Sequence, residues 1–461
     1  MYPSYKQTYH LRTSTLALIA FATLFFARTL DVLGAPSPIN FAHFAFVPLA
    51  CGFALFNTRI QDRRQISTVW TLISVLLIFF TVNLLSALLN GAGLINVILN
   101  FLLLAEPFIM LLTITSIPLS INRIKQMKNW VAIFAIYNLA LAYFQRYVLG
   151  ATNPDFIYGA FFSIAGATVS SIVSLIFSIY YLTSEKDKPL WMRSLPLVAA
   201  FWQIIISDTK LVLGSFIVGF ILFSLSKVSS KTLIYVILGM ILLWGSFWAI
   251  ANIEFLEAYA IWIQPELFTN PDSEFYRAKL TAFREVPEYY DSFLSYLFGV
   301  GPGHGVGRLG GWMMEKYSYL LDPLGATHPY LEMSSDVMAA AASESRNVLG
   351  TAMYGPLFSW AGIWSDLGIV GLGSYLLVWL VVWRYYCLHD FSRYLVMATF
   401  ATGLFPGYLE EPGSMLFTTF VIGLWWHEQR LSSKQKVSTS KVATLSFSKL
   451  PGNQIPGNQI D

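Results

Sequence analysis

Long runs of apolar residues, separated by short polar segments, make up most of the chain. Each run is close to the roughly 20 residues that an α-helix needs to cross a bilayer. The runs lie near residues 15–33, 39–57, 67–90, 93–117, 129–149, 157–183, 232–251, 367–386, 394–409 and 413–428. This pattern predicts an all-α polytopic membrane protein.

One further apolar stretch, residues 194–226, is interrupted by the polar triplet Asp208, Thr209 and Lys210. It would form either one long helix or two short helices that meet at the triplet. Short cytoplasmic loops are rich in Lys and Arg, and only the two-helix reading places most of the 29 basic residues on the cytoplasmic side. We therefore predict about 12 spans of roughly 20 residues or fewer, with both termini in the cytoplasm.

These spans divide the chain into four regions. Residues 1–251 hold the first nine spans, residues 252–366 a large, partly helical extracytoplasmic loop, residues 367–428 the last three spans, and residues 429–461 a Ser- and Lys-rich cytoplasmic tail predicted to be disordered. Only 12% of the residues are charged, about half the fraction that a soluble domain carries. The two cysteines lie in or beside apolar runs, which argues against a disulfide framework and a cysteine-based metal site.

Charged residues within the spans gather toward the outer side. They are Arg28 and Asp31 in the first span, Arg146 in the fifth, and Glu410 and Glu411 at the outer turn of the last hairpin, while Glu106 lies near a mid-plane. Lys210 joins them, because two helices of that length are each too short to cross a core of about 30 Å. Charge at this depth needs a partner or a water-filled cavity. Lys210 therefore pairs with Asp208, or it faces an outward-opening polar cavity.

A glycine-rich segment of the outer loop matches a nucleotide-binding motif letter by letter. Residues 301–311 read GPGHGVGRLGG, in which GVGRLG fits the dinucleotide fingerprint G-x-G-x-x-G. That motif requires a strand before it and a helix after it, and an extracytoplasmic loop meets no nucleotide pool. We therefore expect no nucleotide partner. Glycines let the backbone turn sharply or approach a helix or a ligand closely, which makes Gly301, Gly303 and the intervening His304 candidates for substrate contacts.

Two arginines share one face of a predicted loop helix that begins at Asp272 and ends before Pro287. The polar face holds Arg277, Thr281 and Arg284, and a neighbouring apolar face holds Tyr276, Leu280 and Phe283. Guanidinium groups bind phosphate oxygens in bidentate fashion, so Arg277 and Arg284 suit a diphosphate. The alternative is a solvated face that pairs with Glu274, Glu285 or Glu288.

The loop also offers a candidate general base. The sequence after residue 325 predicts a helix with His328 at its cap and Pro329 at its first position. His328, Glu332 and Asp336 would then share a face, and a histidine oriented by a carboxylate is a general-base arrangement. The same residues would equally form an ordinary capping cluster.

Two more features flank these helices. Asn252–Phe268 predicts a short helix at the membrane interface, with Trp262 at headgroup depth. Ser365 and Asp366 fit the N-cap and first turn of the tenth span.

These motifs together resemble the O-antigen ligase and O-antigen polymerase superfamily. Its members show an Arg, then a Trp, then a Pro-Leu-Phe-Gly-x-Gly-x-Gly-like segment, to which Arg277, Phe283 and Leu297–Gly303 correspond. The family's closing aromatic and glycine-rich stretch, with its acidic residue, resembles Trp360–Leu372 with Asp366 as the acid. A Ser-Arg-like motif that opens a span corresponds to Ser207–Lys210, with Lys in place of Arg. Ligases carry a His just before the closing motif; this chain has Ser359–Gly362 there, so polymerisation is favoured over ligation.

The resemblance implies a GT-C-like fold and glycosyl transfer without a metal or cofactor, at the outer side of the bacterial cytoplasmic membrane. A polyprenyl-diphosphate-linked glycan would donate, and a hydroxyl of a second lipid-linked glycan would attack its anomeric carbon. Arg277, Arg284 and Lys210 would stabilise the departing diphosphate. His328 with Glu332 would accept the proton, and Asp366 is the third catalytic candidate.

The resemblance also implies partners and leaves two other functions open. A chain-length regulator or a flippase would be the protein partner, membrane lipid would surround the spans, and no nucleic acid is expected. One alternative is a ligase that moves the glycan to a different acceptor. The other is a non-enzymatic transporter of lipid-linked glycans, which an outward polar cavity would serve equally well.

Overall fold

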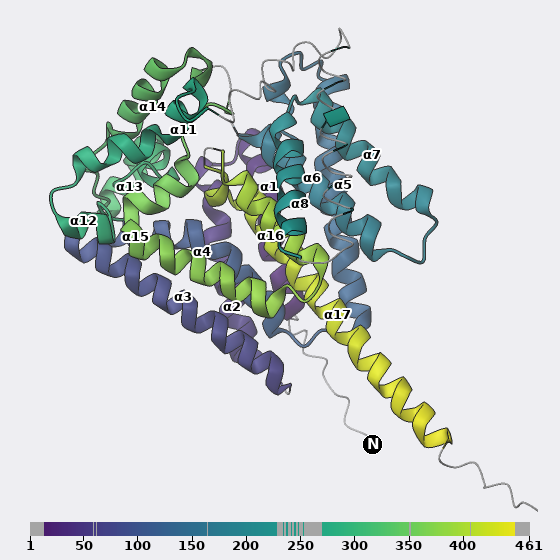
Figure 1. Ribbon diagram of the computed structural model, residues 1–461. Coiled ribbons are helices and arrows are strands. Elements are labelled where there is room, and N and C mark those ends of the chain that lie inside the picture. The colour runs from purple at the N-terminus through teal and green to yellow at the C-terminus, as the bar shows by residue number, and fades with distance from the viewer. Residues whose placement is uncertain are drawn as a thin grey trace, which may run out of the picture.

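The computed structural model describes residues 13–227 and 270–447 except positions 59, 61, 164, 350, 351 and 406, together with single positions between 234 and 252. Regular structure in these residues is helical throughout, and no strand occurs among them (Figure 1). The all-α prediction is therefore confirmed for the described part of the chain. The predicted interfacial helix at Asn252–Phe268, with Trp262, lies outside the described residues apart from its first position.

The first helices follow the predicted apolar runs in order. They are α1 (Thr13–Val32), α2 (Ala42–Asn57), α3 (Arg63–Asn90), α4 (Leu94–Ser116), α5 (Ile121–Tyr147), α6 (Gly166–Ser184), α7 (Leu190–Ile206) and α8 (Lys210–Leu225). The break between α7 and α8 confirms the two-helix reading of residues 194–226, and Asp208 has a left-handed backbone there, with a φ of 50°. Lys210 Nζ lies 2.9 Å from Asp208 Oδ1. Of the two alternatives predicted for Lys210, the structure therefore shows the pair with Asp208.

The sixth predicted span begins too early. Residues 157–163 and 165 are not helical, and side chains of α5 bind part of their backbone. The N–H of Gly159 donates to Gln145 Oε1 at 2.9 Å, and the N–H of Ala160 donates to Asn138 Oδ1 at 3.0 Å. Polar side chains of α5 thus supply hydrogen-bond acceptors to backbone N–H groups that no helix provides for. Such groups need a partner within an apolar interior.

The loop and the C-terminal part continue the helical order. The loop holds α11 (Glu274–Glu285), α12 (Phe293–Phe298), α13 (Met314–Leu321) and α14 (Met333–Glu344), and the last part holds α15 (Phe358–Val381), α16 (Asp390–Thr402) and α17 (Pro412–Phe447). α17 runs beyond residue 428, so the first part of the predicted disordered tail is helical.

The tenth predicted span begins too late. α15 starts at Phe358 rather than near residue 367, and it is kinked at Gly368, whose φ is 66°. Only glycine adopts this backbone conformation without steric cost. Ser365 and Asp366 therefore lie at the end of the first segment of α15. The prediction that they form the N-cap and first turn of this span is wrong.

Among the residues that the structure describes, six helical stretches are long and apolar enough to cross a membrane: Thr13–Val32, Ser37–Asn57, Arg63–Asn90, Leu94–Ser116, Gly166–Ser184 and Phe358–Tyr386. Large apolar side chains also point outward, for example Trp70 and Leu88 on α3 and Trp191 and Val198 on α7, each more than 60% exposed. Continuous exposed apolar faces of this kind are rare on soluble proteins. These features are those of a helical membrane protein.

The helices pack as a bundle with the loop at one end. α17 lies against α4 and α6, α4 against α2 and α3, α15 against α3, and α8 against α16. In Figure 1 the loop helices α11 to α14 gather at one end of α3 and α15, and α17 runs out of the bundle at the opposite end. The loop helices therefore pack at one end of the bundle. The candidate site described below lies between the loop and this end.

Candidate functional site

The glycine segment is held against the kink of α15 by backbone hydrogen bonds. The kink at Gly368 frees the carbonyl groups that precede it, and these accept the N–H groups of Val300 (to Ser365, 2.8 Å) and Gly301 (to Asp366, 3.1 Å). The unpaired carbonyls at the end of a helical segment are thereby satisfied by another part of the chain.

The carboxylate of Asp366 binds the same segment. It is 2% exposed, and it accepts the N–H of Gly303 at 3.0 Å and that of Gly305 at 2.9 Å. A Cβ at Gly305 would lie 2.6 Å from Asp366 Oδ1 and 2.2 Å from Ser365 Oγ. The glycines therefore allow close approach to a helix, one of the two roles expected of them, and the acidic residue of the closing motif orders the loop.

The residue that this ordering places in the interior is Arg308. Its guanidinium forms an ion pair with Glu411, its N–H donates to Glu410 Oε2, and it stacks on the ring of Trp312 with 5.2 Å to the ring centroid. The Arg308 side chain is 15% exposed. Arg308 thus joins the loop to the turn between α16 and α17.

Burial governs the charges around Arg308. It raises the pKa of Glu410 to about 8, an effect to which the neighbouring Asp366 carboxylate adds. It also lowers the pKa of Arg308 to about 10, with the positive charge of Arg28 acting in the same direction. At neutral pH Arg308 is therefore charged and Glu410 largely protonated, which leaves Glu411 as the carboxylate that balances the guanidinium.

A cavity of about 570 Å³ opens beside Arg308, within the range of pockets that hold small ligands. Its lining includes the apolar side chains of Leu331, Met338 and Phe358 and the polar side chains of Glu315, Ser334 and Ser335. Arg308, Trp312 and Glu411, which contact one another, also line it. The cavity therefore offers both an apolar and a charged surface to a single occupant.

A smaller cavity of about 40 Å³ lies next to it and is lined by both apolar and polar residues, some of them from α1 and α2. Arg28 and His43 contribute to this wall, and Arg308, Trp312 and Glu411 line both cavities. Arg28 and Asp31 are at positions i and i+3 of α1, a spacing at which opposite charges pair. Asp31 instead accepts a hydrogen bond from Asn40 at 2.7 Å, and Arg28 faces the small cavity.

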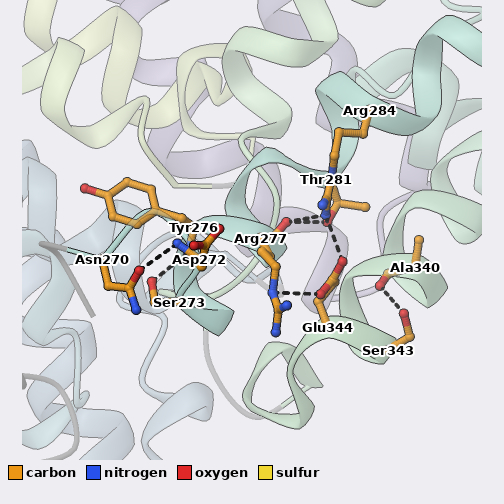
Figure 2. A network of polar contacts seen from close by, with 10 residues as sticks. All are labelled: Asn270, Asp272, Ser273, Tyr276, Arg277, Thr281, Arg284, Ala340, Ser343 and Glu344. Carbon is orange, nitrogen blue, oxygen red and sulfur yellow. Dashed lines mark hydrogen bonds and ion pairs between the residues drawn. The ribbon is translucent and has the colours of Figure 1, made fainter. Parts of the chain in front are cut away.

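The two arginines of α11 share a face, as predicted, but both bind one acidic residue of α14. Arg277 Nε lies 3.1 Å from Glu344 Oε2, and Arg284 Nη2 lies 3.2 Å from Glu344 Oε1 (Figure 2). The two arginine side chains are exposed, at 47% and 46%, and the Glu344 side chain is 26% exposed. The arginines therefore pair with Glu344, which is further along the sequence than the expected partners Glu274, Glu285 and Glu288. These two ion pairs join α11 to α14.

Other details of α11 correct the sequence interpretation. Ser273, not Asp272, caps the helix, because its hydroxyl accepts the N–H of Tyr276. The predicted apolar face is correct only in part: Phe283 packs on the Trp364 ring, but Leu280 is 44% exposed, and the buried face includes Ala278 and Ala282. Small residues lie inward because α11 packs closely on α14.

The predicted base arrangement is also wrong in its geometry. α14 begins at Met333, so His328 is neither its cap nor on its face. Thr327 explains this, because its N–H and carbonyl bind the side chain of Asn96 at 3.0 and 2.9 Å and hold the chain against α4. Glu332 is exposed, and Asp336 accepts a hydrogen bond from the Tyr289 hydroxyl at 2.6 Å. Among the described residues, nothing is hydrogen-bonded to either ring nitrogen of His328.

His304 is fully enclosed. Its Nδ1 lies 3.0 Å from the carbonyl of Val300 and its Nε2 lies 2.8 Å from the Thr327 hydroxyl, and burial lowers its pKa, which keeps the ring neutral. The structure thus brings Gly301, Gly303, His304 and Asp366 together as one ordered loop. None of the predicted site residues lines either cavity; these are Lys210, Arg277, Arg284, Gly301, Gly303, His304, His328, Glu332 and Asp366.

The residues that do line the cavities were only partly visible in the sequence. Arg308 was passed over because it lies inside GVGRLG, which was set aside as a chance match. The available signal was the acidic pair Glu410 and Glu411 at an outer turn, since buried acids require a nearby cation. In the part of the chain that the structure describes, no group of three or more His, Cys, Asp and Glu residues is arranged to hold a metal ion.

No protein-family model matches the chain, and no curated protein matches it at a significant level. The resemblance to the O-antigen ligase and polymerase superfamily therefore stays a prediction.

Proposed function

We propose that this protein polymerises polyprenyl-diphosphate-linked oligosaccharides at the outer side of the bacterial cytoplasmic membrane. The observation that carries the proposal is the cavity of about 570 Å³ that is lined by both apolar and polar side chains and by the buried Arg308. Its substrate would be amphiphilic in the same way, with an apolar lipid, a doubly charged diphosphate and a polar glycan. The cavity lies under the loop that the topology prediction places outside the cytoplasm.

Within this proposal Arg308 binds the diphosphate, with Arg28 as a second cation in the adjoining cavity. The two take the place of Arg277 and Arg284, which both contact Glu344 and line neither cavity. A guanidinium binds phosphate oxygens bidentately, and its charge stabilises the leaving group as the glycosidic bond breaks.

Glu411 holds the Arg308 guanidinium in place. The two side chains form an ion pair, and because a guanidinium has five N–H donors, those not bound to Glu411 stay available to the diphosphate. Trp312, on whose ring Arg308 and Lys316 both lie, presents an aromatic surface of the kind that stacks on sugar rings.

The product of the reaction tests the proposal. Purified protein given one polyprenyl-diphosphate-linked glycan should produce a ladder of longer glycans, without nucleotide and in the presence of EDTA. A ligase would leave this donor unchanged until a different acceptor was added, and a transporter would never alter it. A donor that remains intact with every acceptor would contradict enzymatic activity and favour transport.

Two variants locate the diphosphate. Arg308→Ala should lower turnover by at least tenfold, which corresponds to about 1.4 kcal/mol of transition-state stabilisation. Arg308→Lys should recover only part of it, because an ammonium group lacks the bidentate fork. Full activity in Arg308→Ala, together with a loss of activity in Arg277→Ala, would show that the arginines of α11 bind the diphosphate instead.

The location of the loop is tested independently. In a background without Cys51 and Cys387, an impermeant maleimide should label Ser334→Cys but not Ser438→Cys in intact cells. The opposite labelling would place the cavity on the cytoplasmic side and remove the basis of the proposal.

A further inference from the structure

A histidine and a glutamate form a buried pair between α2 and α4. His43 Nδ1 lies 2.8 Å from Glu106 Oε2 and 3.0 Å from Oε1, and the two residues are 7% and 1% exposed. Glu106 was the one charged residue that the sequence placed near a mid-plane. A carboxylate at this depth is costly unless it is paired and hydrogen-bonded, and His43 is the partner that the fold supplies.

The hydrogen bond fixes which nitrogen of His43 is available. Because a carboxylate only accepts hydrogen bonds, Nδ1 carries the proton, and the lone pair of the neutral ring is on Nε2. Within the described residues, no group is hydrogen-bonded to Nε2. A carboxylate that holds one ring nitrogen orients the ring and stabilises the imidazolium that forms when the other nitrogen accepts a proton.

His43 also lines the cavity of about 40 Å³, together with Arg28, Arg308 and Glu411. By volume this cavity accommodates roughly two or three water molecules. It shares Arg308, Trp312 and Glu411 with the larger cavity. His43 and Arg308 thus face the same small cavity, and water in that cavity would connect His43 with a substrate held at Arg308.

We propose that His43, oriented by Glu106, accepts the proton of the attacking sugar hydroxyl; this inference rests on the proposed function. The hydroxyl oxygen forms a bond to the anomeric carbon of the donor while the bond from that carbon to the diphosphate oxygen breaks. The bonding electron pair leaves with the diphosphate. The hydroxyl proton passes through water to His43 Nε2, and the imidazolium later returns it to solvent.

The neighbouring carboxylates are less suited to this role. Glu411 is held in an ion pair with Arg308, and Glu410 accepts the Arg308 N–H and is largely protonated at neutral pH, because burial raises its pKa to about 8. His328 lines neither cavity. His43 combines a free ring nitrogen, an orienting carboxylate and a position on the cavity wall.

The test measures steady-state polymerisation by purified variants. General-base catalysis typically contributes 10²–10⁴-fold, so His43→Gln should lower kcat by at least about 100-fold while KM for the donor stays within about twofold. Glu106→Gln should also lower kcat, by up to about 10⁴-fold, the effect of replacing the carboxylate that orients a histidine base by an amide. Imidazole added to His43→Ala should restore part of kcat, which a purely structural loss would not allow.

The matched control is His427→Gln, a second buried histidine on α17 whose Nε2 lies 3.0 Å from the Ile114 carbonyl and which lines neither cavity. It should polymerise at the wild-type rate. Wild-type kcat in His43→Gln, or a loss in His43→Ala that imidazole does not restore, would overturn the assignment and leave polymerisation intact. Wild-type protein that extends no donor would instead overturn the proposed function.

Discussion

Removal of the Arg308 guanidinium leaves the Glu411 carboxylate buried without its ion-pair partner. The two side chains are 15% and 9% exposed, so water screens their interaction only slightly. Deleting one partner of a buried ion pair typically costs about 3–5 kcal/mol. We therefore expect Arg308→Ala to lower the free energy of unfolding by about 3–5 kcal/mol. The backbone N–H that binds Glu410 is retained in this variant, so the loss reports the side chain alone.

A double variant separates the structural role of Arg308 from its chemical role. Arg308→Met with Glu411→Leu removes both charges, and apolar replacement of a buried pair is often neutral or stabilising. This variant should regain most of the lost stability and still fail to polymerise, because the diphosphate no longer has a guanidinium to bind. A single alanine variant that is as stable as the wild type would refute the reasoning on burial.

Equilibrium unfolding in mixed detergent micelles measures the free energy, and the glycan ladder measures activity. Arg146→Ala is the control, since Arg146 donates to the Ala151 carbonyl at 2.7 Å and lines neither cavity. We expect it to lose only about 1 kcal/mol, the typical value of one hydrogen bond. A double variant that is stable and fully active would show that Arg308 only supports the fold.

Buried titratable groups and a close glycine contact give three more measurable outcomes. Burial raises the pKa of Glu410 from 4.5 to about 8, so the folded protein keeps a proton that the unfolded chain releases. Thermal stability should therefore fall between about pH 5 and pH 8. Glu410→Gln should abolish this fall. The pKa of Lys279 is lowered by burial from 10.5 to about 7, so stability should rise between about pH 7 and pH 10, and a rise that persists in Lys279→Met would disprove this origin. Gly305→Ala, whose new Cβ would meet Asp366 Oδ1 at 2.6 Å, should lose about 1–3 kcal/mol; an unchanged melting temperature would show that the loop adapts.

The helices could be predicted from the sequence because their signals are local. Each apolar run is a property of neighbouring residues, and the break at Ser207–Thr209 falls where the polar triplet interrupts one such run. The shared face of Arg277 and Arg284 likewise follows from spacing along α11 alone. Their partner Glu344 could not be inferred in this way, because it lies on another helix, 60 positions from Arg284.

The contacts of the candidate site could not be predicted from the sequence for the same reason. Arg308 meets Glu410 across 102 positions of sequence, and His43 meets Glu106 across 63. The late start of α14 has a similar cause, since Thr327 is bound to Asn96 of α4, 231 positions away. Local propensity favours a helix from Pro329, and tertiary hydrogen bonds override it.

The cavities bring together charges from parts of the chain that have no local reason to meet. Arg28 comes from α1, His43 from α2, Arg308 from the glycine segment and Glu411 from the turn before α17. Stability alone does not account for such a gathering, since apolar side chains of similar volume would fill the same space at equal or lower cost. The order imposed by Asp366 on the glycine segment adds to this argument, because it fixes Arg308 in place before any ligand binds, and groups fixed in advance stabilise developing charge without reorganisation. The loop is therefore best understood as the element that positions one guanidinium over a polar cavity, and this explains why its glycines and its acidic contact occur together.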